Sequence, residues 1–159
     1  MAGDDVVAAA PSIIGWSDDF ALDLPEIDAQ HQVLFGLFGE LWNAIVARSG
    51  RADMLRLIAD LDDYAVQHFK EEEAFMAATG FPRLAGHRMA HETFVRRIAA
   101  ERAAVEGGAP NLSLDLLRFL RDWLVEHIMV ADREYARYYS ESINQPGSGL
   151  AGFFNRLSR

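Results

Sequence analysis

The sequence predicts an all-α protein, an up-down-up-down four-helix bundle with an N-terminal arm and a short C-terminal tail. Apolar residues recur at helical spacing in four long stretches. Turn signals containing glycine or proline separate these stretches. We find no run with the strict alternation of apolar and polar residues that is typical of a strand. Because the connections between the four helices are short, the helices are expected to pack antiparallel.

The first two helices are bounded by recognisable start and stop residues. Apolar residues at helical spacing run from about residue 26 to residue 48, and Gly50 ends this helix. The second helix begins near Asp53, which is a good N-cap, and Gly80 ends it. The residues expected to form the inner face of the first helix are Ile27, Leu34, Leu37, Phe38, Leu41 and Ile45.

The third and fourth helices are separated by a loop at residues 107–111. Pro82 suits the first turn of the third helix, which extends to about Val105. Asn111 or Ser113 caps the fourth helix, and this helix is expected to run to about Ser140.

Residues 1–143 are expected to form a single domain, with residues 1–25 as an arm, and residues 144–159 to form a linker and tail. In the tail, apolar residues recur at helical spacing from Leu150 to Leu157, and Arg156 and Arg159 add positive charge. Two interpretations stay open for residues 150–159. The segment docks into a hydrophobic groove of a protein partner, or it folds back on its own bundle or stays disordered.

Composition excludes several functions. The formal net charge of −9 argues against nucleic-acid binding, because phosphates would be repelled. The absence of cysteine excludes disulfides and thiolate metal sites. No apolar run approaches the ~20 residues that a membrane span needs. The N-terminus carries acidic residues where a secretory signal needs basic ones. We therefore expect a soluble cytoplasmic protein.

All five histidines fall at helical spacing, and the bundle brings them together. His68 and Glu72 are four residues apart, as are His87 and His91, so each pair points from one helix face. Antiparallel packing places the start of the odd helices beside the later part of the even ones. Imidazole and carboxylate suit iron, zinc or copper. One metal site is therefore predicted, with these residues within about a turn or two of one level: His31, His68, Glu72, His87, His91, His127 and Asp132.

Asp132 does not share a face with His127 on a regular helix. A spacing of five residues rotates it by ~140° around the axis. Either the carboxylate reaches in from the flank, or the helix contains a π-bulge, which often marks a functional site. Two other acidic residues, Glu71 and Glu73, are expected to form a solvated face together with Lys70.

The order of these residues, H…HxxxE…HxxxH…HxxxxD, resembles the hemerythrins, and single-domain bacterial members look the most similar. The same resemblance is carried by His68-Phe69, Glu72-Glu73 and Met76, by the segment from Pro25 to His31, and by the segment from Trp123 to His127. It covers about residues 16–139.

The resemblance implies a pair of non-haem iron ions joined by an oxo or hydroxo bridge. It assigns His87, His91 and His127 to one iron, His31 and His68 to the other, and Glu72 and Asp132 to both as bridges. One coordination position then stays open, on the iron with two histidines, where a diatomic ligand would bind. Matched to the family motif, four residues look like an apolar pocket around bound O2: Leu34, Phe69, Trp123 and Ile128.

The implied function is reversible O2 binding for storage, delivery or sensing, without enzymatic turnover beyond weak oxidase or peroxide chemistry. Di-iron oxidases use mostly carboxylate ligands, whereas this site has five neutral imidazoles and two carboxylates, a balance that favours O2 carriage over O–O cleavage. Two alternatives stay open. One is a di-iron enzyme that acts on O2, peroxide or nitric oxide. The other is a structural or zinc-binding helical bundle.

Overall fold

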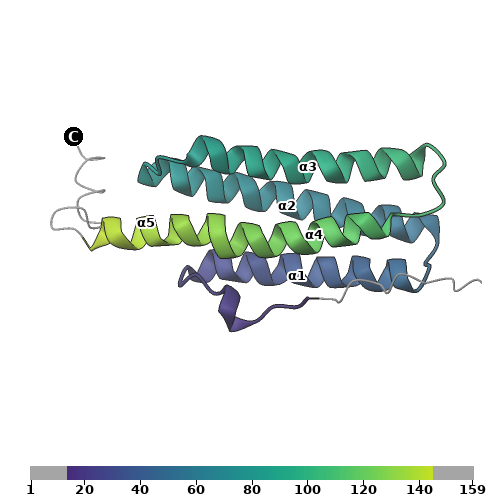
Figure 1. Ribbon diagram of the computed structural model, residues 1–159, viewed down its shortest axis with the longest axis horizontal. Coiled ribbons are helices and arrows are strands. Elements are labelled where there is room, and N and C mark those ends of the chain that lie inside the picture. Colours follow the sequence, from purple (N-terminus) through teal and green to yellow (C-terminus); the bar gives the residue numbers. More distant parts are fainter. Residues whose placement is uncertain (1–13, 145–159) are drawn as a thin grey trace, which may run out of the picture.

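The computed structural model describes residues 14–144, and these residues are helical over most of their length (Figure 1). No strand occurs among them. A short 3-10 helix at Asp18–Phe20 precedes the bundle. The α-helices are α1 (Pro25–Val46), α2 (Arg51–Thr79), α3 (Leu84–Glu106), α4 (Leu114–Glu126) and α5 (Arg133–Ile143), and a π-helical turn at His127–Asp132 joins α4 to α5.

These helices form the predicted four-helix bundle. The segments α4, the π-helical turn and α5 follow one another without a break and make up the fourth helical rod. Successive rods run in opposite directions, with the loops at alternate ends (Figure 1). Helix α1 packs on α2, α2 on α3, α3 on α4, and α4 returns to α1. The four rods therefore enclose a common interior.

Two helix starts differ from the sequence prediction. Helix α2 begins at Arg51 after Gly50, without a side-chain cap. Asp53 lies in its first turn instead, where a carboxylate is still favourable beside the positive end of the helix dipole. Helix α3 begins at Leu84, because the residues from Pro82 onward form a turn before the helix.

Two other helix ends have the expected chemistry. The Oγ atom of Ser113 accepts a hydrogen bond from the backbone N–H of Leu116 at 3.1 Å, so Ser113 is the N-cap of α4. Helix α2 ends at Gly80, which has a φ angle of 71°. Residues other than glycine rarely adopt this left-handed backbone conformation.

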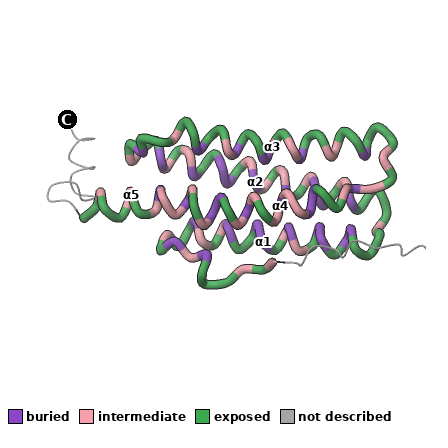
Figure 2. The backbone as a smooth tube through the Cα atoms, viewed as in Figure 1, coloured by how far each residue is buried: buried purple, intermediate pink, exposed green. Residues whose placement is uncertain are grey.

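Buried side chains line the inner faces of all four rods, whereas the outer faces are exposed (Figure 2). Along α2, Leu61, Ala65 and Phe69 belong to a large apolar core. Met76, about two turns later, belongs to a separate apolar cluster with Phe81 and Tyr135. Of the buried polar residues of α2, His68 directly precedes Phe69, and Glu72 lies between the two clusters in the sequence.

The described part of the N-terminal arm packs on the bundle. The ring of Phe20 lies 4.8 Å from that of Phe35 in α1, and Trp16 contacts both rings. The Arg133 guanidinium donates a hydrogen bond to the backbone oxygen of Asp19 at 2.6 Å. Residues 1–13 and 145–159 lie outside the described part of the chain, and the tail predicted at 150–159 is among them. No helix of the described residues is long and apolar enough to cross a membrane.

Candidate metal centre

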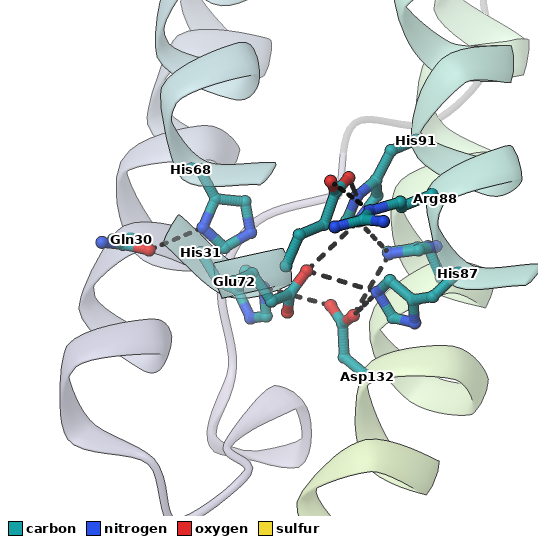
Figure 3. A network of polar contacts seen from close by, with 10 residues as sticks. Gln30, His31, His68, Glu72, His87, Arg88, His91 and Asp132 are labelled. Carbon is teal, nitrogen blue, oxygen red and sulfur yellow. Dashed lines mark hydrogen bonds and ion pairs between the residues drawn. The ribbon is translucent and has the colours of Figure 1, made fainter. Parts of the chain in front are cut away.

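The bundle brings the seven side chains predicted as metal ligands into one buried cluster (Figure 3). Helix α1 contributes one of them, α2 and α3 contribute two each, and the π-helical turn contributes two. Each of these residues is at most 6% exposed. The cluster consists of His31, His68, Glu72, His87, His91, His127 and Asp132.

Three histidines surround one end of the cluster. The Nε2 atom of His87 lies 3.0 Å from Oδ1 of Asp132 and 3.3 Å from Oε2 of Glu72. The Nε2 atom of His91 lies 3.1 Å from the same Glu72 oxygen, and that of His127 lies 3.1 Å from Asp132 Oδ1. One donor atom from each of these five residues falls within 4.8 Å of all the others. We call these five residues the three-histidine group.

Two histidines lie at the other end. Donor atoms of His31, His68 and Glu72 also fall within 4.8 Å of one another, and we call these residues the two-histidine group. The second oxygen of Asp132, Oδ2, lies 3.2 Å from Nε2 of His31. Glu72 therefore belongs to both groups, and Asp132 contacts histidines of both. This is the placement that two bridging carboxylates need.

The π-helical turn explains how Asp132 reaches the cluster. In a π-helix the backbone hydrogen bonds join residues five apart. His127 and Asp132, which are five apart, are the first and last residues of this turn. Their side chains point to one place, with 3.1 Å between His127 Nε2 and Asp132 Oδ1. Of the two possibilities that the sequence leaves open, the structure has the π-bulge.

Several buried polar atoms of the cluster have no hydrogen-bond partner among the described residues. They include Oε1 of Glu72 and Nδ1 of His31, whereas the Asp132 oxygens and Nε2 of His31 make ion-pair contacts only within the cluster. Each unsatisfied buried polar atom costs about 1–3 kcal/mol, and more when it is charged. Imidazole nitrogens and carboxylate oxygens that converge on one another in this way fit a cation, because a cation would accept the lone pairs that point into the cluster. The residues present therefore fit a metal pair.

The histidines of the cluster differ in protonation when no metal is present. Although burial opposes the charge of His31, Asp132 raises its pKa. Burial lowers the pKa of His68 to about 4, so this imidazole is neutral. Burial also disfavours the charged form of His87, but the carboxylates of Asp132 and Glu72 outweigh it and raise its pKa to about 9. Burial likewise opposes the charge of Asp132, yet the adjacent histidines hold its pKa well below the usual range.

A chain of hydrogen bonds orients His68 from outside the cluster. Its Nδ1 atom lies 2.6 Å from Oε1 of Gln30. Since an amide oxygen only accepts, Nδ1 carries the proton and Nε2 is left for a metal. The Gln30 amide donates in turn to Oε2 of Glu71 at 2.5 Å, and Gln67 donates to Oε1 of the same carboxylate at 2.7 Å. Glu71 is exposed, as predicted, but it also holds the residue that orients His68.

Glu73 has the corresponding role for His91. Its Oε1 atom lies 2.8 Å from Nδ1 of His91, and its Oε2 atom accepts a hydrogen bond from Nε of Arg88 at 3.1 Å. The prediction that Glu73 belongs to a solvated face is therefore wrong. A carboxylate on the outer nitrogen fixes the tautomer of a metal-binding imidazole and raises its basicity.

A small apolar cavity of about 10 Å³ lies in the core next to aromatic rings that stack on the histidines, and Leu34, Phe69 and Trp123 are among the residues that line it, whereas no clustered histidine does. Ile128, also predicted for the O2 pocket, is buried but does not line this cavity. The ring of Phe69 stacks on His91 at 3.9 Å, and the ring of Trp123 stacks on His127, which lies on the same helical rod, at 4.3 Å. The cavity has about the space that one water-sized molecule needs.

Residues 22–139 match the family model described as the hemerythrin HHE cation binding domain. The chain is 31% identical over 134 residues to a bacteriohemerythrin of Stenotrophomonas maltophilia (strain R551-3). The matched region covers 84% of this chain and 86% of that protein. It is 33% identical over 125 residues to a myohemerythrin of Riftia pachyptila, covering 79% and 92%. A crystal structure of wild-type hemerythrin matches with a TM-score of 0.72 and 30% identity, covering 79% of this chain and 97% of that one. This chain therefore belongs to the hemerythrin family.

Proposed function

We propose that this protein binds O2 reversibly at a non-haem di-iron centre built from the seven clustered side chains. The observation that carries the proposal is the pair of overlapping donor groups that share Glu72, with Asp132 in contact with histidines of both. His87, His91 and His127 would hold one iron and His31 and His68 the other. Membership of the hemerythrin family supports iron as the metal.

When bound, the iron pair supplies the electrons on which reversible O2 binding draws. The protein sets the ligand balance, and five imidazoles with two carboxylates carry little negative charge for two metal ions. Such a site stabilises highly oxidised iron less than a carboxylate-rich one does. The proton on His68 Nδ1 is held by Gln30, and the outer nitrogen of His91 is fixed by Glu73, so both rings present Nε2 inward.

The two-histidine group has fewer donors than the three-histidine group, and we place the open coordination position there. Leu34, Phe69, Trp123 and Ile128 would form the apolar wall around bound O2. Support comes from the burial of Leu34, Phe69 and Ile128, and from the cavity that three of the four residues line. An apolar wall restricts water, which slows the loss of electrons from the metal to solvent.

The alternatives have less support. A purely structural bundle gives no reason for five buried histidines and two buried carboxylates at one level, with several of their polar atoms unpartnered. A carboxylate-rich ligand set would favour an enzyme that cleaves O2, but this site has five imidazoles and only two carboxylates. We therefore assign O2 binding, and not turnover of O2, peroxide or nitric oxide, as the function of this centre.

The proposal is tested by an iron count combined with optical spectra. The purified protein should bind about two irons per chain, one for each donor group. The reduced form is expected to be nearly colourless, to gain charge-transfer bands in air, and to lose them when oxygen is removed. A zinc-loaded sample is the control and should stay colourless. Zinc as the sole native metal, or an oxygenated spectrum that cannot be reversed, would contradict the proposal.

A further inference from the structure

A pocket of about 370 Å³ opens between α1, α2 and α5 on the side of the two-histidine group. Three carboxylates line it, those of Glu26, Glu71 and Glu72, and no lysine or arginine is found among its described lining residues. Glu26 and Glu71 are exposed, whereas Glu72 is 1% exposed. The pocket therefore leads from the surface to a carboxylate of the metal centre.

The other openings suit a cation less well. A groove of about 450 Å³ between α2 and α3 reaches His91, but Lys70 and Arg96 line it together with Glu73 and Glu92. The small cavity in the core is apolar and has only about 10 Å³, which is too little for a hydrated metal ion. Of these three openings, the acid-lined pocket is the one that combines negative charge with room for an ion.

Glu72 supplies an independent indication that an ion arrives from this pocket. Its Oε1 atom is buried and has no hydrogen-bond partner among the described residues, while its Oε2 atom lies near His87 and His91. We propose that the pocket is the port through which a divalent cation, ferrous iron in the proposed function, reaches the centre. The inference rests on the proposed di-iron function and adds the route by which the metal is loaded.

The arrangement of charges explains how such a port works. Carboxylates at the mouth of a cleft raise the local concentration of a cation and speed its association. Glu71 is already held by Gln30 and Gln67, so it contributes a fixed negative charge. The Glu26 carboxylate makes no hydrogen bond or ion pair with the described residues, so its charge can be changed without breaking a side-chain contact. At the inner end, Glu72 belongs to both donor groups and offers an incoming ion its first buried oxygen.

The experiment measures the rate of metal uptake by the metal-free full chain. Co2+ is the probe, because its ligand-field absorption reports binding without oxygen chemistry. Glu26→Lys should slow uptake on the order of tenfold, and Glu26→Gln by less, because the charge change is smaller. The final metal content should stay at the wild-type level in both variants, since Glu26 is not among the clustered donors. Added salt should slow the wild-type protein more than the Glu26→Lys variant.

Glu92→Lys is the matched control. It makes the same charge change at an exposed residue in the rival groove between α2 and α3, and it should leave the uptake rate within about twofold of wild type. Slow uptake in this variant with normal uptake in Glu26→Lys would overturn the port and assign the route to the rival groove. Equal rates in all three proteins would also overturn it. A wild-type chain that binds no metal pair at equilibrium would instead refute the proposed function, and the port with it.

Discussion

The two ends of the metal centre are built from the same kinds of side chain, imidazole and carboxylate, but their histidines differ in protonation before a metal binds. In the two-histidine group, burial lowers the pKa of His68 to about 4, so its ring is neutral, and Gln30 orients it. In the three-histidine group, His87 lies against both carboxylates, and its pKa is raised to about 9 although burial opposes this. His68 is therefore ready for a cation, whereas His87, and His31 whose pKa is raised by Asp132 although burial opposes this, are held in internal ion pairs that a metal must displace.

The rings are oriented in the same way in both groups, whereas the surroundings of the two groups differ. The residues outside the cluster, Gln30 for His68 and Glu73 for His91, fix the rings of both groups. The surrounding contacts differ, because the two-histidine group lies beside the acid-lined pocket and aromatic rings stack on His91 and His127 of the other group. We therefore expect the two metal positions to respond differently to mutation and to pH.

The largest effect is expected from Asp132→Ala, because this carboxylate contacts both groups. Its oxygens lie 3.2 Å from His31 and 3.0 Å from His87. Its removal should lower the affinity for both metals by more than the ~10–100-fold that is typical of residues outside the ligand set. Metal analysis and thermal melting of the loaded protein would measure the loss. A variant that kept two irons and an unchanged spectrum would show that Asp132 is not a bridge.

The next prediction compares the two groups directly. His31→Ala leaves a single histidine at its end of the centre, so the variant should keep about one metal per chain and lose O2 binding. His91→Ala leaves His87 and His127 with the shared carboxylates, so it should retain two metals with weaker binding. Native mass spectrometry of the loaded variants would count the metals. Equal losses in the two variants would show that the ends are equivalent.

Smaller effects are expected from the residues that orient the rings. Gln30→Ala should weaken the two-histidine metal, and Glu73→Gln the three-histidine metal, each by about 10–100-fold. Gln67→Ala is the control, because Gln67 contacts Glu71 and no imidazole. Competition with a chelator would measure the two affinities. If Gln67→Ala were as damaging as Gln30→Ala, a general loss of helix packing would explain both.

The last prediction concerns pH and the metal-free protein. Between pH 6.5 and about 9 the folded state keeps a proton on His87 that the unfolded state releases, so stability should fall as the pH rises. Between pH 6.5 and about 4 the unfolded state protonates His68 and the folded state does not, so stability should fall as the pH drops. Each slope approaches about 1.4 kcal/mol per pH unit.

Urea unfolding of the metal-free protein at a series of pH values would measure both slopes. The His87→Gln variant should have a smaller alkaline slope, with the remainder due to His31, and should keep the acidic slope. The His68→Gln variant should lose the acidic slope and keep the alkaline one. A flat profile in the wild-type protein would mean that the two histidines titrate alike, and the comparison between the groups would then fail.

The fold could be predicted from the sequence because long helices leave a strong apolar period. The sequence predicts a single helix from about residue 111 or 113 to Ser140, and the structure has a rod from Leu114 to Ile143 that contains a π-helical turn. Helix starts were less accurate. At Asp53 a good capping residue lies inside the helix, because a carboxylate is favourable at the cap and in the first turn alike.

The seven clustered side chains could be predicted because each lies at helical spacing and antiparallel packing brings them to one level. Gln30 and Glu73 could not be recognised, because they lie next to the predicted ligands in sequence and on partly exposed faces. Their importance comes from ring nitrogens on other helices, His68 on α2 and His91 on α3. The helical period of one segment carries no information about which neighbour lies across from a surface residue.

Anomalous X-ray diffraction at the iron edge, from crystals of the iron-loaded protein, tests the central claim most directly. Two peaks are predicted within the buried cluster, one among His87, His91 and His127 and the other beside His31 and His68, with Glu72 and Asp132 between them. A single peak, or a pair of peaks to which Glu72 and Asp132 do not both bind, would contradict a di-iron centre with two shared carboxylates.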